Sequence, residues 1–197
     1  MRLIFASNNQ HKIEELKQLA GKEIEIVSLK DAGIDIDIPE PHDTLEGNAS
    51  EKSWTIYKLT VRDCFSEDTG LEIEALNGEP GVKSARYAGE ARSFKDNIEK
   101  VLNKLSGETN RNARFRAVIS LVVGGNETQF EGICNGKIID TPHGTEGFGY
   151  DPIFIPDGSN RSFAEMSIVE KNQFNHRTKA AAKLVAFLQN MKTKSTN

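Results

Sequence analysis

The segment ARFRAVISLVVGGNETQFEGICNG, Ala113–Gly136, decides the fold class of this chain. It holds two long runs of apolar and β-branched residues that are separated only by GGN. Such a pattern predicts a β-hairpin of two long strands. The N-terminal part instead predicts a strand over Arg2–Ala6, a helix over Lys12–Ala20 that ends at Gly21, and a strand over Glu23–Leu29. Because β and α elements alternate early and a hairpin follows, we expect an α/β fold with a mixed sheet.

Helical periodicity and capping residues predict the remaining helices. Asp43 followed by Glu46 resembles a capping box, and Ser93 is a candidate N-cap. A strand pattern ends at SEDTGL, Ser66–Leu71, where Thr-Gly indicates a turn. The predicted segments are helices over Thr44–Val61, Phe94–Leu105 and Asn175–Met191, a loop over 142–158 and a frayed tail over 192–197.

Length and composition limit the classes of protein that this chain can be. Its 197 residues, 37% hydrophobic and 27% charged, suit a single domain, 1–197, with two lobes. A formal net charge of −4 argues against nucleic acid as a partner, although a local basic pocket could still bind a small anion. Cys64 and Cys134 form neither a disulfide framework nor a metal spacing, and the short apolar N-terminus suits neither a signal peptide nor a membrane span. We therefore expect a cytoplasmic protein without a membrane partner.

Two adjacent acids, Glu67 and Asp68, mark the end of the SEDTGL strand pattern. Neighbouring strand residues point to opposite faces, so one acid, with Asp68 favoured, could face a ligand at the strand end. Mg²⁺ would need a second carboxylate, and Glu40 in the extended IPEP segment is the candidate. The alternative is that both acids are solvated turn residues.

The polar stretch SNNQHK, Ser7–Lys12, lies between a predicted strand and a predicted helix. A helix N-terminus presents free N–H groups and the positive end of its dipole, which favour phosphate. The stretch lacks the glycines of a Walker loop, so that motif is excluded. An ordinary helix cap at the surface is the alternative interpretation.

Two late segments complete the candidate site. In GTEGFGYDPIF, glycines surround Phe148, whose ring could stack on a base, or the segment is a surface loop anchored by that ring. In EKNQFNHR, the basic side chains of Lys171, His176 and Arg177 could donate hydrogen bonds to oxygen atoms, or they lie on a solvated face. Together these segments suit a nucleoside triphosphate and a metal-assisted attack by water.

The sequence resembles the inosine triphosphate pyrophosphatase family over nearly its whole length, from Leu3 to about Leu188. The similarity is carried by five ordered motifs, namely ASNNQHKIEE, NASEK, SEDTGLEIEALNGEPGVKSARYAG, FGYDPIF and EKNQFNHR. The resemblance implies an elongated mixed sheet flanked by helices, with two lobes around a deep substrate cleft, usually in a homodimer. It also implies hydrolysis of ITP, dITP or XTP to the monophosphate and pyrophosphate, with Mg²⁺.

The same resemblance assigns roles to individual residues. Asp68 becomes the general base and a metal ligand, Glu40 the other metal ligand, and Glu67 a group that supports Asp68. Phe148 stacks on the base, and Lys171, His176 and Arg177 read the 6-oxo group, which adenine lacks. The triphosphate would be held by Ser7, Asn8, Asn9, Gln10, His11, Lys12, Lys52 and Thr69, while Gly149, Tyr150 and Asp151 lie beside the base.

The chain departs from the family pattern at a few positions, and other functions remain open. Asn8 replaces a glycine, so the backbone there must reach its conformation with a side chain present, and Asn tolerates positive φ better than most residues. Gly47 stands where bacterial members usually have Glu. The alternatives are a related pyrophosphatase for modified pyrimidine nucleotides and a nucleotide-binding regulator without turnover.

Overall fold

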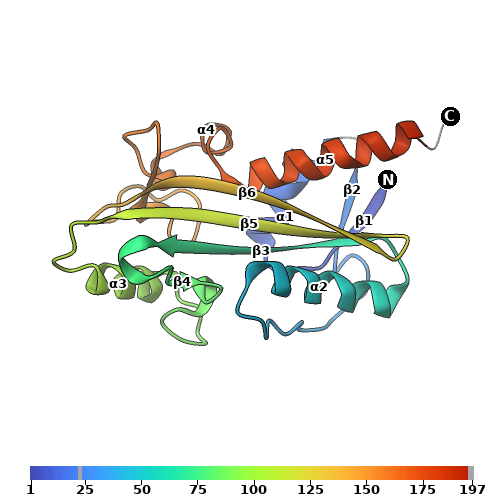
Figure 1. Ribbon diagram of the computed structural model, residues 1–197, viewed down its shortest axis with the longest axis horizontal. Helices are drawn as coiled ribbons and strands as arrows, with labels where there is room; N and C mark the ends of the chain where they lie inside the picture. Colours follow the sequence, from blue (N-terminus) through green and yellow to red (C-terminus); the bar gives the residue numbers. More distant parts are fainter. Residues whose placement is uncertain (22–23, 195–197) are drawn as a thin grey trace. The chain divides into compact units, whose positions relative to one another are not determined.

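This computed structural model describes residues 1–21 and 24–194. It contains a mixed β-sheet flanked by helices (Figure 1). The strands follow the order β2-β1-β3-β5-β6-β7, and β4 pairs with β3 outside this path. β1 pairs in parallel with β2 and β3, whereas the β3–β4 and β6–β7 pairs are antiparallel. The predicted α/β class with a mixed sheet is therefore confirmed. The strands are β1 (Arg2–Phe5), β2 (Glu25–Ser28), β3 (Cys64–Ile73), β4 (Pro80–Gly81), β5 (Asn112–Val123), β6 (Asn126–Ile138) and β7 (Phe154–Pro156).

The helices begin and end at residues that suit these positions. Ser93 caps α3 as predicted, and its hydroxyl accepts a hydrogen bond from the Asp96 N–H. The α2 cap is Thr44 rather than Asp43, because the extended Thr44 backbone directs its hydroxyl toward the Gly47 N–H. The helices are α1 (Gln10–Leu19), α2 (Leu45–Thr60), α3 (Phe94–Lys104), α4 (Ile168–Lys171) and α5 (His176–Lys194), with 3₁₀ turns η1 (Glu74–Leu76), η2 (Ser84–Arg86), η3 (Asp151–Ile153) and η4 (Phe163–Glu165).

The chain folds into two units, each with its own core. Unit 1 comprises Met1–Asp68, Ala117–Gly132 and Arg177–Asn197, and unit 2 comprises Thr69–Arg116 and Ile133–His176. Each unit therefore contains segments that are far apart in the sequence.

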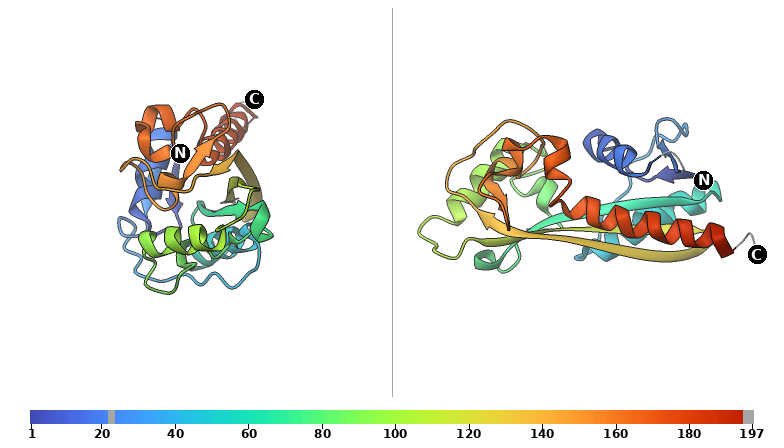
Figure 2. Two further views of the ribbon diagram at one scale, coloured as in Figure 1. Left: turned by 90° about the vertical axis from the view of Figure 1, so that its left-hand side faces the viewer. Right: turned by 90° about the horizontal axis from the view of Figure 1, so that it is seen from above.

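Alternation along the strands gives unit 1 two apolar layers. Leu3, Phe5 and Phe65 pack with α1 and α5, whereas Ile4 and Cys64 pack with α2 on the other face. Successive strand residues point to opposite faces, so these short strands supply both layers at once. Figure 2 shows α5 lying along the part of β5 and β6 that belongs to unit 1.

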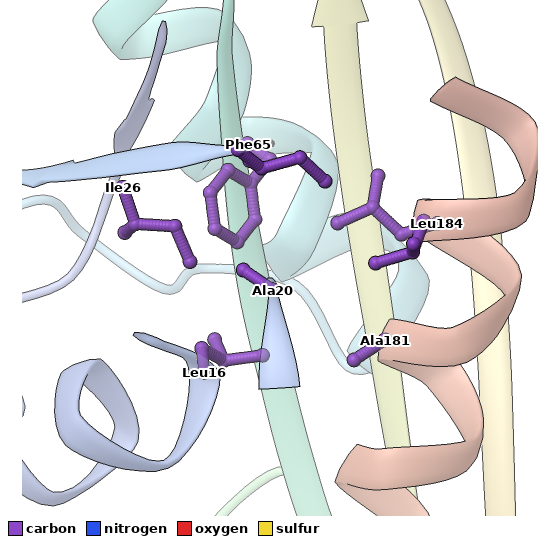
Figure 3. Close-up of a pocket in the computed structure, with 8 residues that line it drawn as sticks. Leu16, Ala20, Ile26, Phe65, Ala181 and Leu184 are labelled. Carbon is purple, nitrogen blue, oxygen red and sulfur yellow. The ribbon is translucent and has the colours of Figure 1, made fainter. Parts of the chain in front are cut away.

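Apolar side chains from α1, β2, β3 and α5 converge in the first of these layers (Figure 3). Leu16, Ile26, Phe65 and Leu184 point toward one another around a cavity of about 10 Å³. A space of this size holds at most one water molecule, and its apolar lining gives that water no partners. The cavity is therefore a packing defect of the core and not a ligand site.

The core of unit 2 is aromatic. The Phe115 ring lies 4.7 Å from the Phe154 ring and 4.8 Å from the His176 ring, and it stacks on the latter at an interplanar angle of 10°. Val101 of α3 and Leu105, the C-cap of this helix, are fully buried in the same cluster. Each large apolar side chain buried in this way contributes about 1.5–3 kcal/mol to stability.

The expected turn after SEDTGL was wrong, since β3 continues through this segment to Ile73. The reason is β4, which pairs with Leu71 and Glu72. A Cβ atom on Gly70 would lie 2.6 Å from the carbonyl oxygen of Gly81, so this glycine permits a close approach between strands instead of a turn.

The remaining predictions on secondary structure are mostly confirmed. β5 and β6 are joined by Gly124 and Gly125, both with positive φ, as a two-residue hairpin turn requires. The predicted loop over 142–158 was wrong in part, because it contains η3 and the short strand β7, which pairs with β6. Asn8 does not need a positive φ, since the non-glycine residues of positive φ in the described chain are Val61, Asn77 and Arg92.

Two predictions reach beyond the residues that the structure describes. Glu23 of the expected Glu23–Leu29 strand and the last three residues of the tail lie outside the described ranges. Over those ranges, no helix is both long enough and apolar enough to cross a bilayer. The prediction of one domain with two lobes stays a prediction.

Candidate active site

Two carboxylates of unit 1 share one lysine ammonium group. Lys52 Nζ donates to Asp68 Oδ1 and to Glu40 Oε1, each at 2.8 Å. Asp68 lies on β3, Lys52 on α2, and Glu40 between two prolines in the segment without helix or strand that precedes α2. The second carboxylate oxygen of Asp68, Oδ2, is buried and accepts no hydrogen bond from the described residues. An acceptor in this state is available to a ligand or a metal ion.

Burial changes the acid–base properties of this group of side chains. Burial raises the pKa of Asp68 above its ordinary value, although Lys52 and Lys12 act in the opposite direction. Burial lowers the pKa of Lys12, and the charge of Glu67 only partly compensates. The pKa of Lys52 is raised, because Asp68 and Glu40 outweigh the effect of its burial. Asp68 is therefore a better proton acceptor than an exposed aspartate.

Glu67 faces a different set of charged groups. Both of its carboxylate oxygens accept hydrogen bonds from Arg177, at 2.7 Å from Nε and 2.9 Å from the second terminal nitrogen. The other terminal nitrogen of Arg177 donates to Glu15 on α1, and Lys12 Nζ lies 3.4 Å from Glu67. Burial lowers the pKa of Arg177, but Glu67 and Glu15 more than compensate, so the net shift is upward. The two acids of SEDTGL thus accept hydrogen bonds from different residues, in agreement with strand alternation.

The loop between β1 and α1 ends in an Asn cap. Asn9 Oδ1 accepts a hydrogen bond from the Lys12 N–H, and Ser7 Oγ accepts one from the Asn9 N–H, both at 3.2 Å. Asn8 donates from its amide to the Ile36 carbonyl. Gln10 pairs with Glu14 in the first turn, and His11 beside it is exposed. The cap uses the Lys12 N–H, and the ammonium group of the same residue lies next to Glu67.

In unit 2, Asp151 organises the glycine-rich segment around Phe148. Asp151 Oδ2 accepts hydrogen bonds from the Phe148 N–H at 2.9 Å and from Lys171 Nζ at 2.7 Å. Gly147 has a φ of +74°, and a Cβ atom there would lie 2.1 Å from the same Asp151 oxygen. Lys171 Nζ lies 5.3 Å from the centre of the Phe148 ring, within cation–π range. The ring is therefore held beside a buried cation.

Two further predicted residues of unit 2 are buried. The Tyr150 hydroxyl donates to the Ser84 carbonyl at 2.8 Å, and burial raises the pKa of this phenol. His176 stacks on Phe115, and Gly149 has a φ of +63° between Phe148 and Tyr150. Asp151, through its bonds to the Phe148 N–H and to Lys171, supports both of these residues, and the sequence did not indicate this structural role.

The predicted residues divide between the two units. Arg177 belongs to unit 1 and binds Glu67 and Glu15, whereas Lys171 belongs to unit 2 and binds Asp151. The predicted residues of unit 1 are Ser7, Asn8, Asn9, Gln10, His11, Lys12, Glu40, Lys52, Glu67, Asp68 and Arg177, and those of unit 2 are Thr69, Phe148, Gly149, Tyr150, Asp151, Lys171 and His176.

Two buried polar residues on the helices that carry Lys12 and Lys52 were missed from the sequence. Glu15 lies three residues after Lys12 on α1, and Asn48 lies four residues before Lys52 on α2. Each is therefore on the same helix face as a predicted lysine. The available signal in the sequence was a polar residue on the helix face of a predicted lysine. In the structure, Glu15 and Asn48 are both buried.

Comparisons with known proteins identify the family to which this chain belongs. The model of the Ham1 family matches residues 3–187. The chain is 48% identical over 190 residues to a protein of Flavobacterium psychrophilum named dITP/XTP pyrophosphatase, which covers 96% of this chain and 100% of the relative. A relative of the same name from Porphyromonas gingivalis is 47% identical, with 95% of this chain and 97% of the relative covered.

Solved structures of similar proteins have the same fold as this chain. The Staphylococcus aureus Ham1 protein has a TM-score of 0.89 and 40% identity, with 97% of this chain and 100% of that chain covered. A structure from Mycobacterium abscessus, described as nucleoside-triphosphatase / dITP/XTP pyrophosphatase, has a TM-score of 0.77 and 38% identity, with 93% and 98% covered.

Proposed function

Because the chain belongs to the Ham1 family, we propose that it hydrolyses non-canonical purine nucleoside triphosphates to the monophosphate and pyrophosphate. The substrates are dITP, XTP and ITP, and the reaction removes them from the nucleotide pool. Relatives named dITP/XTP pyrophosphatase, 41–48% identical over nearly the whole chain, support this function.

The observation that carries the proposal is the buried Asp68 beside Lys52 and Glu40 in unit 1. Its Oδ1 is held by Lys52, while Oδ2 accepts no hydrogen bond from the described residues. Asp68 would orient a water molecule through Oδ2 and accept its proton, a role that its raised pKa favours. Lys12 and Lys52 would bind phosphate oxygens and stabilise the negative charge that develops on the leaving pyrophosphate.

The same carboxylates fit a magnesium ion. Mg²⁺ prefers oxygen ligands, and it is usually held by one or two carboxylates together with water and substrate phosphates. Glu40 and Asp68 supply that number, and no cluster of three His, Cys, Asp or Glu side chains able to hold a metal occurs in the described residues. Mg²⁺ bound here would neutralise phosphate charge and lower the pKa of a coordinated water.

In unit 2, Phe148 would stack on the purine base, with Gly149 and Tyr150 beside it. Lys171 and His176 would donate hydrogen bonds to the 6-oxo oxygen, which adenine lacks. A buried donor that loses its acceptor is costly, so this arrangement would discriminate against ATP. Arg177 stays a prediction for the same role, although its bonds to Glu67 and Glu15 indicate a structural role.

The proposal also includes the remaining predicted contacts with the triphosphate, the oligomeric state of the protein and its location in the cell. Ser7–Lys12 at the start of α1 and Thr69 on β3 would bind the triphosphate, since a helix N-terminus favours phosphate. Homodimer formation and a cytoplasmic location follow from the family resemblance and stay predictions.

The experiment measures pyrophosphate release from ITP, dITP, XTP, ATP, GTP and dTTP with Mg²⁺, and Asp68→Asn serves as the inactive control. We expect rapid release from the first three nucleotides and slow release from the others. Preference for a pyrimidine nucleotide would replace the proposed substrate class, and tight binding without turnover would indicate a regulator. Orthophosphate as the first product would contradict the proposed cleavage position.

A further inference from the structure

Asn48 forms a two-point clamp on the loop that carries Glu40. Its Oδ1 accepts a hydrogen bond from the His42 N–H at 2.9 Å, and its Nδ2 donates to the His42 carbonyl at 3.0 Å. Asn48 is buried in the first turns of α2, 1% exposed. One side chain thus satisfies both backbone groups of a single loop residue, as a neighbouring strand would do.

The clamp lies at the position that controls Glu40. Residues 34–42 form no helix or strand, so the segment lacks a backbone ladder of its own. Pro39 and Pro41 flank Glu40 and have no N–H, so the His42 N–H is the first backbone donor after Glu40. Upstream, Ile36 and Ile38 pack against the α2 side of the unit 1 core. Downstream of Glu40, the bonds to Asn48 fix the chain.

The clamp and the partner of Glu40 occupy the same face of α2. Asn48 and Lys52 are four residues apart, which places their side chains one turn apart on one side of a helix. Lys52 Nζ is the group 2.8 Å from Glu40 Oε1. We propose that Asn48 is a positioning residue that places the Glu40 carboxylate against Lys52 and Asp68. The proposal rests on the proposed function, because it deepens the description of that site.

Gly47 is a second part of the same device. A Cβ atom at this position would lie 2.8 Å from His42 Cβ, 2.9 Å from His42 Cγ and 3.0 Å from Thr44 Oγ1. His42 Cβ is attached directly to the backbone that Asn48 holds, so it cannot move without moving the clamp. Gly47 is therefore matched to His42 in this chain.

The first experiment is a double-mutant cycle on stability, with neither metal nor nucleotide present. Asn48→Ala and Glu40→Gln are made singly and together, and unfolding by urea is followed through Trp54 fluorescence. If Asn48 positions Glu40 against Lys52, Asn48→Ala should change the unfolding equilibrium constant by a factor about fivefold smaller in the Glu40→Gln background than in the parent background. Additive effects would overturn the proposal, whether or not the enzyme hydrolyses nucleotides.

Asn97 provides the matched control. It is the fourth residue of α3, as Asn48 is of α2, and it is buried with a similar clamp on the Ala88 N–H and the Ala85 carbonyl. Asn97→Ala should destabilise the protein but remain additive with Glu40→Gln, because Asn97 holds Ala85 and Ala88 and not the segment that carries Glu40. Coupling as large as that of Asn48→Ala would overturn the specific role of Asn48.

The second experiment uses activity and a rescue. Gly47→Ala and Asn48→Ala should each raise the Mg²⁺ concentration for half-maximal rate at least threefold, in folded protein. His42→Gly, which removes the clashing Cβ, should restore most of this loss in the Gly47→Ala background. An unchanged Mg²⁺ requirement in active Asn48→Ala, or no rescue by His42→Gly, would overturn the proposal. Absence of hydrolysis in the parent protein would instead refute the proposed function. The stability cycle tests the role of Asn48 without requiring any hydrolysis.

Discussion

Arg177 is the largest fully buried side chain of the described residues, and its replacement gives a sharp test of the charge network in unit 1. Its guanidinium donates two hydrogen bonds to Glu67 and one to Glu15. Arg177→Met keeps much of the side-chain volume and removes all three. Hydrogen bonds to charged groups contribute about 1.5–3 kcal/mol each, so three set an upper limit of about 9 kcal/mol.

The expected loss is smaller than this limit, because the variant no longer has to bury a guanidinium. Removing one partner of a buried ion pair typically costs about 3–5 kcal/mol, and we expect Arg177→Met to lie in that range. The cost arises from two buried carboxylates that lose the guanidinium, although Lys12 still lies 3.4 Å from Glu67. Glu15→Gln should therefore recover part of the stability in the Arg177→Met background.

The loss should also depend on pH, with a sign that follows from proton binding. In Arg177→Met, the folded state can lower its charge repulsion by binding a proton on one carboxylate, which the unfolded state does not need. The folded state then binds more protons than the unfolded state, so the stability of the variant falls as pH rises. The difference from the parent protein should be larger at pH 8 than at pH 5.5.

Equilibrium unfolding in urea, followed through Trp54, suits this test because the single tryptophan lies in unit 1. Arg161→Met is the control, since Arg161 forms a solvent-exposed ion pair with Glu170 and should change stability little. If Arg177→Met costs no more than this control, or if its loss does not shrink toward pH 5.5, the network does not stabilise the fold as argued here.

Three further outcomes are expected. Asp68→Asn should lower kcat at least about 100-fold with an unchanged circular dichroism spectrum, because the proton acceptor is lost, and near-normal turnover would exclude this role. Phe148→Ala should weaken nucleotide binding by about 1–3 kcal/mol with a smaller effect on kcat, measured as separate KM and kcat values, whereas an unchanged KM would rule out base stacking. The Cys64 thiol, whose pKa burial raises to about 12, should not react with a disulfide reagent at pH 8 in native Cys134→Ser protein but should react in urea; rapid native labelling would show that the site opens.

The local elements of this protein were largely determined by its sequence. The strand, polar loop and helix at the N-terminus, the hairpin around Gly124 and Gly125, and the Ser93 cap all depend on residues that are near one another in the chain. Backbone preferences, hydrophobic periodicity and capping act over a few residues, so a single sequence reveals them. The motifs also indicated which residues are candidates for the site.

Tertiary structure alone decided which partners these residues have. Glu67 and Arg177 are 110 positions apart and Glu15 and Arg177 are 162 apart, so no local pattern could show that Arg177 binds these two acids. The continuation of β3 past Thr69 depended on pairing with β4, and the His42 backbone two residues after Glu40 is held by Asn48 of α2. Burial makes these pairings decisive, because a charged or polar group removed from water must find a partner wherever the fold supplies one.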